Sequence, residues 1–159
     1  MKDLLDSPQT HEENGVLTYY VATVLAVSPE VVWQNITNIE KLLKWDSMLL
    51  EMSGSIRENG KIKLRSAIKP KQTFKLKVSE FAPNKKMVWT SSMGPLFRGV
   101  RTYEVLPHDG GTTLFRMNEE FSGWLLPIMK GVLPDCNVLF GTYIRDLKKE
   151  INSMNLEKA

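Results

Sequence analysis

The hydrophobic pattern of the chain changes its period once, and this change most constrains the fold. Between residues 61 and 121, short segments alternate apolar and polar residues, which is typical of half-buried β-strands. In "KIKLRSAIK" (61–69), for example, Ile62 and Leu64 fall on one side and the lysines on the other. Towards the end, apolar residues recur at helical spacing instead, at 136, 139, 140, 143, 144, 147 and 151. This stripe predicts one long amphipathic helix from Asp135 to Asn152.

The first third of the chain adds a strand and two short helices. "GVLTYYVATVLAV" (15–27) is rich in β-branched residues and predicts a strand. Ser28 and Pro29 are suited to the cap and first position of a helix over "SPEVVWQNI", and "NIEKLLKWDSM" predicts a second helix. Asn59-Gly60 predicts a hairpin turn. "WLLPIMKGVL" (124–133) fits either a separate short helix or the start of a kinked longer one.

The predicted order is one strand, two short helices, about six antiparallel strands and one long helix. This is an α+β arrangement, with a curved antiparallel sheet of about seven strands and the helices on one face. A long helix lying in the curve of such a sheet does not fill it everywhere. If the two short helices close one end, a cavity remains between sheet and helix.

Composition narrows the class of protein. The chain has 159 residues, 42% apolar and 25% charged, which predicts one globular domain over residues 15–154 after a flexible polar tail over residues 1–14. No apolar run reaches the roughly 20 residues of a membrane-spanning helix, and no signal core begins the chain, so we expect a cytoplasmic protein without membrane insertion. A net charge of +3, from 21 basic and 18 acidic residues, argues against nucleic-acid binding.

Few residues are available for a metal or cofactor site. The single Cys136 excludes an internal disulfide and a multi-cysteine metal site. Only two histidines occur, His11 in the tail and His108 in a turn, which argues against a histidine-based triad or zinc site. We therefore expect no cofactor and no metal. Cys136 falls on the apolar stripe of the last helix and is expected to be a buried small hydrophobe.

One charged residue stands out in "FRMNEEF" (115–121). Phe115, Met117 and Phe121 share one side of this predicted strand with Glu119, so a carboxylate faces an otherwise apolar interior. Such a group costs several kcal/mol unless it is paired or hydrated. The position of Glu119 therefore predicts a hydrated interior, a partner for the charge, or both.

A three-residue turn over "DGG" (109–111) would supply that partner. It would pair residue 108 with residue 112 and place Arg101 opposite Glu119, as a hydrogen-bonded ion pair. A two-residue turn would shift the register and remove this pair. With the three-residue turn, three facing pairs are expected to border the cavity: Arg101 and Glu119, Tyr103 and Met117, and Val105 and Phe115.

Several segments together resemble a known superfamily. These are "VSPEVVWQNITNIEKLLKW" (27–45), "VSEFAPNKKMVW" (78–89), "FRGVRTYEV" (97–105) and "GGTTLFRMNEEFSGWLLP" (110–127). Over roughly residues 16–152 the chain resembles the SRPBCC group, the START-related helix-grip superfamily of the birch-pollen allergen and the bacterial polyketide cyclases/dehydrases. The resemblance implies a bacterial protein with the helix-grip fold, a polar residue at Arg101 and an acid at Glu119. It does not fix the activity, because this fold also serves lipid carriers, hormone receptors and chaperone co-factors.

The leading hypothesis is a carrier or sensor, monomeric or homodimeric, that binds a small hydrophobic or amphipathic ligand in the cavity. Arg101 and Glu119 would orient the ligand, and Trp124, which follows a conformational break at Gly123, would lie at the cavity rim. The candidate ligand-binding residues are Arg101, Glu119, Tyr103, Trp89, Ser66, Met117, Trp124 and Tyr143.

Two other functions stay open. In a cyclase/dehydrase-like enzyme, Glu119 or Tyr143 would move a proton and Arg101 would stabilise an enolate, although no nucleophile–base pair is visible, so catalytic residues stay unassigned. Alternatively, a module resembling the activator of the Hsp90 ATPase would dock a partner on a basic outer sheet face. The hairpin around "KPK" (69–71) is predicted to place Arg65 near Lys75 and Lys63 near Lys77 on that face.

Overall fold

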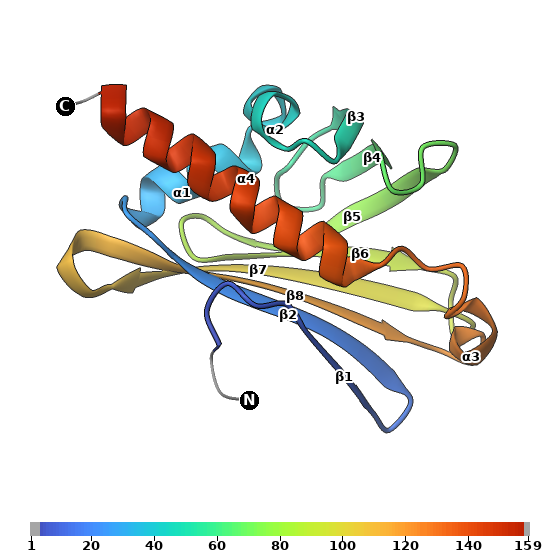
Figure 1. The fold of residues 1–159 in the computed structure, drawn as a ribbon. Coiled ribbons are helices and arrows are strands. Elements are labelled where there is room, and N and C mark those ends of the chain that lie inside the picture. Colours follow the sequence, from blue (N-terminus) through green and yellow to red (C-terminus); the bar gives the residue numbers. More distant parts are fainter. Residues whose placement is uncertain (1–3, 158–159) are drawn as a thin grey trace.

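The computed structural model describes residues 4–157 and consists of a curved sheet with helices on its concave side (Figure 1). The chain begins with strands β1 (Gln9–Glu13) and β2 (Val16–Leu25), followed by helices α1 (Pro29–Thr37) and α2 (Ile39–Trp45). The next strands are β3 (Leu49–Gly54), β4 (Lys61–Ser66), β5 (Thr73–Ala82), β6 (Lys86–Ser92), β7 (Arg98–His108) and β8 (Thr112–Ser122). Helices α3 (Leu126–Met129) and α4 (Cys136–Glu157) follow.

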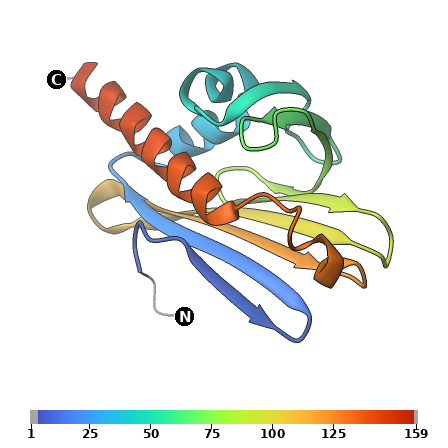
Figure 2. The ribbon, with the colours of Figure 1, turned by 45° about the vertical axis from the view of Figure 1, so that its right-hand side comes forward.

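All neighbouring strands are antiparallel, in the order β1-β2-β8-β7-β6-β5-β4-β3. Helices α1, α2 and α4 lie on the same side of this sheet (Figures 1 and 2). The α+β arrangement predicted from the sequence is therefore confirmed. Within the described residues the sheet has eight strands, one more than the sequence indicated.

The additional strand lies in the segment expected to be a flexible tail. β1 pairs along the edge of β2, with Gln9 opposite Tyr20 and Glu13 opposite Val16. Asn137 at the start of α4 also donates a hydrogen bond to the Thr10 hydroxyl, at 2.8 Å. The strand is held by backbone pairing and polar contacts and its side chains are mostly exposed, so it lacks the apolar pattern that reveals a strand in a sequence.

The helices form where the sequence predicts them; Ser28 is the N-cap residue of α1, but its side chain makes no capping hydrogen bond. The Asn38 side chain caps α2 by accepting a hydrogen bond from the backbone N–H of Lys41, at 3.1 Å. Helix α4 buries the predicted stripe, which includes Cys136, Phe140, Tyr143, Ile144, Leu147 and Ile151. Helix α3 is separate from α4, which decides between the two alternatives for residues 124–133. No helix within residues 4–157 combines the length and the apolar character needed to cross a lipid bilayer.

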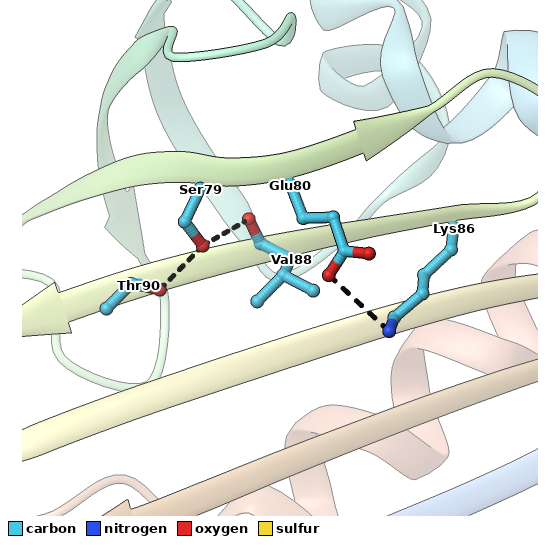
Figure 3. Close-up of polar contacts among 5 residues, drawn as sticks. All are labelled: Ser79, Glu80, Lys86, Val88 and Thr90. Carbon is cyan, nitrogen blue, oxygen red and sulfur yellow. Dashed lines mark hydrogen bonds and ion pairs between the residues drawn. The ribbon is translucent and has the colours of Figure 1, made fainter.

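A bulge helps to curve the sheet. The β5–β6 register shifts between Val78 and Glu80, which leaves Ser79 as the extra residue. Its hydroxyl donates to the backbone carbonyl of Val88 at 3.3 Å and lies 2.9 Å from the Thr90 hydroxyl, while Glu80 forms an ion pair with Lys86 (Figure 3). A bulge bends its strand and increases the local twist. This bend helps the sheet to curve towards α4 on the side of β4 and β5 (Figure 1).

The predicted pairing on the basic outer face is wrong by two residues. Lys61 lies opposite Lys77, and Lys63 lies opposite Lys75. Arg65 lies opposite Thr73 and instead forms an ion pair with Glu51 at 2.9 Å. The turn between β4 and β5 is centred on Lys69 rather than Pro70, because successive backbone bonds from Lys69 to Ser66 and from Gln72 to Lys69 fold it. A shift of two residues keeps the same side chains on the outer face.

The turn after β8 depends on Gly123, which has a φ of 112°. A Cβ atom there would lie 2.5 Å from the carbonyl oxygen of Leu96. We expect Gly123→Ala to lower the free energy of unfolding by about 2 kcal/mol, through backbone strain and this clash. The measurement is urea denaturation, with Gly131→Ala as control, because a Cβ on Gly131 meets nothing within 4 Å. Equal stability of the two variants would contradict the prediction.

Candidate ligand-binding site

The concave side of the sheet encloses a cavity of about 320 Å³. It lies between the inner faces of β3 to β8 and the first turns of α4, and α2 and the segment after α3 also contribute to its wall. Most of its lining is apolar, including Leu64, Leu76, Phe97, Met117 and Phe140. The apolar side chains on the inner face of the strands, which the sequence predicted to face a core, therefore partly face this cavity.

An ion pair crosses the floor of this cavity. Arg101 of β7 lies opposite Glu119 of β8, and His108 pairs with Thr112, which is the register of a three-residue turn. The Nε atom of Arg101 donates to an Oε atom of Glu119 at 2.5 Å. The Arg101 and Glu119 side chains are 24% and 10% exposed. The predicted partner of the buried carboxylate is thus confirmed.

The charge on Arg101 is retained despite its burial. Burial by itself lowers the pKa of Arg101, but the nearby Glu119 carboxylate raises it, and the net result is a pKa well above the ordinary value. The guanidinium carbon also lies 5.3 Å from the centre of the Phe140 ring in α4, at cation–π distance. The pair is therefore a fixed polar group between the sheet and the helix.

Two buried tyrosines stand next to the ion pair. Tyr103 lies two residues after Arg101, on the same face of β7. Its ring centroid is 4.9 Å from that of Trp89 and 6.2 Å from that of Tyr143. Burial raises the pKa of Tyr103, although Arg101 partly opposes this rise. Burial also raises the pKa of Tyr143 well above its ordinary value. Both hydroxyls are protonated at neutral pH, so Tyr143 is not a base there.

Trp89 and Cys136 also contribute polar groups to the cavity lining. The indole N–H of Trp89 is buried and has no hydrogen-bond acceptor among the described residues. Such a group costs free energy until an acceptor reaches it. Burial raises the pKa of Cys136 to about 12, so its thiol is protonated and is a poor nucleophile. Among residues 4–157, no three His, Cys, Asp or Glu side chains are grouped as a metal ion would require.

The sequence reasoning missed Asp46, which also lines the cavity. Asp46 is the C-terminal cap of α2, and its carboxylate accepts the backbone N–H of Met48 at 3.0 Å. Burial raises its pKa to about 6; Asp146 raises it further, while the Met48 N–H and Arg101 lower it. One sequence signal was available: a carboxylate directly after buried Trp45 at a helix C-terminus is unfavourable to the helix dipole.

The structure brings most of the predicted site residues together. Seven of the eight candidates line the cavity: Ser66, Trp89, Arg101, Tyr103, Met117, Glu119 and Tyr143. The eighth, Trp124, does not line it, and its side chain is 77% exposed, because the turn at Gly123 directs the chain outward. Val105 and Phe115, expected to border the cavity, are instead fully buried and do not line it.

Comparison with known proteins places the chain in a family. The sequence model of the family described as polyketide cyclase/dehydrase and lipid transport matches residues 17–136. The chain belongs to this family. No curated protein has a sequence that matches it significantly.

Solved structures of several other proteins share the fold. A START superfamily protein from Mycobacterium smegmatis has a TM-score of 0.67 at 15% identity, covering 86% of this chain and 98% of its own. A conserved protein of unknown function from Enterococcus faecalis has a TM-score of 0.63 at 18% identity, covering 95% and 89%. CalU16 from Micromonospora echinospora has a TM-score of 0.61 at 12% identity, covering 95% and 90%. The fold is thus the START-like helix-grip fold.

The half-buried carboxylate of Asp46 predicts a specific pH dependence of stability. The unfolded chain releases this proton near pH 3.8 and the folded protein near pH 6, so the folded state loses stability as pH rises between these values. We expect Asp46→Asn to be more stable than the wild type by about 2 kcal/mol at neutral pH, a value discounted for partial exposure. The difference should disappear below the lower of the two values. Denaturation of both proteins across this range is the measurement, and a pH-independent difference would contradict the assignment.

The ion pair predicts a large effect of neutralising one partner. Glu119→Gln leaves the Arg101 charge buried without its counter-charge, and we expect a loss of about 3 kcal/mol in the free energy of unfolding. The double variant Arg101→Met with Glu119→Leu removes both charges and should recover most of that loss. Chemical denaturation of the three proteins tests this. A double variant no more stable than Glu119→Gln would show that the pair is not an electrostatic unit.

Proposed function

We propose that this protein is a carrier or sensor that binds a small hydrophobic or amphipathic molecule in the cavity beneath α4. The observation that supports this most is a cavity of about 320 Å³ with a largely apolar wall and a charged pair at its floor. Small-molecule sites have volumes of about 300–1,000 Å³ and combine apolar walls with a few polar groups that orient the ligand. Burial of the apolar part of the ligand would supply most of the affinity, at about 25 cal/mol per Å² before ordering costs.

The polar groups favour a ligand that accepts hydrogen bonds. The Trp89 N–H lacks an acceptor, and the hydroxyls of Tyr103 and Tyr143 are protonated at neutral pH. Arg101 offers further N–H groups beyond the Nε that Glu119 engages. Glu119 already balances the Arg101 charge, and Asp46 becomes negative above a pH of about 6, so an anionic head group gains little attraction. A neutral carbonyl or hydroxyl group on an apolar skeleton is the best match.

A second candidate function rests on Asp46. A carboxyl group with a pKa of about 6 that lines a ligand cavity can both accept and donate a proton near neutral pH. Together with the fixed Arg101 charge, it would suit a cyclase or dehydrase reaction, in which a proton moves and an enolate needs stabilisation. The two candidates differ in the fate of the bound molecule, which a carrier releases unchanged and an enzyme releases as product.

The cavity can be tested by filling it. Ser66 is buried in the cavity wall, and Ser66→Phe would occupy the space that the ligand needs. We expect native mass spectrometry of the wild-type protein to show a co-purifying small molecule, and thermal-shift screening with sterols, fatty acids and aromatic polyketides to give stabilising compounds. Ser66→Phe should lose both signals, since it removes the volume without touching the ion pair.

The control is Ser53→Phe, the same substitution at an exposed position of the neighbouring strand β3. It should retain ligand binding. Equal binding by Ser66→Phe and Ser53→Phe would contradict a ligand in this cavity, as would an empty wild-type protein with no thermal shift. Mass analysis of the compound after incubation separates the two functions, because only an enzyme changes its mass or structure.

A further inference from the structure

Large apolar side chains are exposed at the mouth of the cavity. They lie in the connection between β6 and β7, in the turn after β8, in α3 and in the segment that follows α3. We call this group the apolar rim; it consists of Met93, Leu96, Trp124, Ile128 and Val132, with exposed fractions between 40% and 77%. Exposed apolar residues are ordinary when scattered, but a contiguous group marks an interaction surface.

Backbone contacts make the rim one continuous surface. The N–H of Leu125 donates to the carbonyl of Leu96 at 2.8 Å, and the N–H of Trp124 lies 3.4 Å from the carbonyl of Pro95. Figures 1 and 2 show α3 beside the β6–β7 connection at one end of the molecule, away from the C-terminus of α4. Met93 and Val132 also line the cavity. The rim therefore borders the cavity at this end of the molecule, which we call the cavity mouth.

The charges around the mouth are mainly positive. The segments that reach it, residues 67–72, 93–98 and 123–135, contain Lys69, Lys71, Arg98 and Lys130 but only one acid, Asp135. Lys130 forms an ion pair with Glu12 of β1. Within the described residues, Lys69, Lys71 and Arg98 form no ion pair. The mouth thus combines exposed apolar groups with unneutralised cations.

We propose that the apolar rim docks on the surface of a lipid bilayer that contains anionic lipids, with the cavity mouth facing the bilayer. Trp124 is suited to this contact, because tryptophan favours the level of the lipid head groups. The cations would contact anionic head groups, whose negative surface potential attracts basic residues close to the bilayer. A second copy of this chain is a poorer occupant, because a two-fold contact through the rim would bring the same cations face to face. Docking of this kind would let an apolar ligand move between bilayer and cavity without crossing water.

Vesicle co-sedimentation tests the proposal whether or not the cavity holds a ligand. The probe is vesicles of equimolar phosphatidylcholine and phosphatidylglycerol, with phosphatidylcholine vesicles for comparison. We expect the wild type to bind the mixed vesicles more strongly, and Trp124→Ser with Ile128→Ser to reduce the partition coefficient by about tenfold. Leu156→Ser is the matched control, because Leu156 is equally exposed but lies at the far end of α4.

Tryptophan fluorescence gives a second measurement that does not depend on the double variant folding. Trp33, Trp45 and Trp89 are buried, so Trp124 is the tryptophan that senses a change outside the core. Its emission should shift to shorter wavelength when mixed vesicles are added, and Trp124→Phe should abolish the shift. An unchanged emission, or equal loss of vesicle binding in Leu156→Ser, would overturn the proposal. Concentration-dependent dimerisation that Ile128→Ser abolishes, without vesicle binding, would assign the rim to self-association instead.

Discussion

The ion pair between Arg101 and Glu119 is the interaction on which the interior of this protein depends. The two residues face each other across the β7–β8 hairpin, and the guanidinium also contacts the Phe140 ring of α4. A carboxylate or a guanidinium alone at this depth would be strongly unfavourable. Because each neutralises the other, the sheet can keep a polar floor beneath the long helix, on the inner side of the cavity.

The cavity owes its character to the contrast between this floor and its walls. The walls are largely apolar, and they also carry two protonated tyrosine hydroxyls and the Trp89 N–H, which has no acceptor among the described residues. Asp46 adds a group that titrates near neutral pH and that shares the cavity with Arg101. The family includes cyclases, dehydrases and lipid transport proteins by description, and the same scaffold can serve binding or proton transfer depending on a few such groups.

The outer sheet face and the cavity mouth differ in the kind of side chain that they expose to solvent. The outer sheet face presents Lys61 opposite Lys77 and Lys63 opposite Lys75, where solvent screens like charges that would not be tolerated inside. The cavity mouth instead exposes apolar side chains that gain nothing from water. Two residues of the apolar rim, Met93 and Val132, also line the cavity, which links the rim to the proposed function.

The sequence by itself determined the order of β2 to β8 with α1, α2 and the α4 stripe, because hydrophobic period acts locally. It also restricted the β7–β8 turn to two lengths, and the structure has the longer one, which pairs Arg101 with Glu119. Only the tertiary structure decided the rest. β1 is held by pairing to the edge of β2 rather than by apolar burial, and the β4–β5 register depends on how its longer turn folds. Asp46 lines the cavity and Trp124 lies outside it, because of how α2 and the Gly123 turn direct the chain. Burial determines both the pKa of a group and its exposure, and burial is a property of the assembled fold.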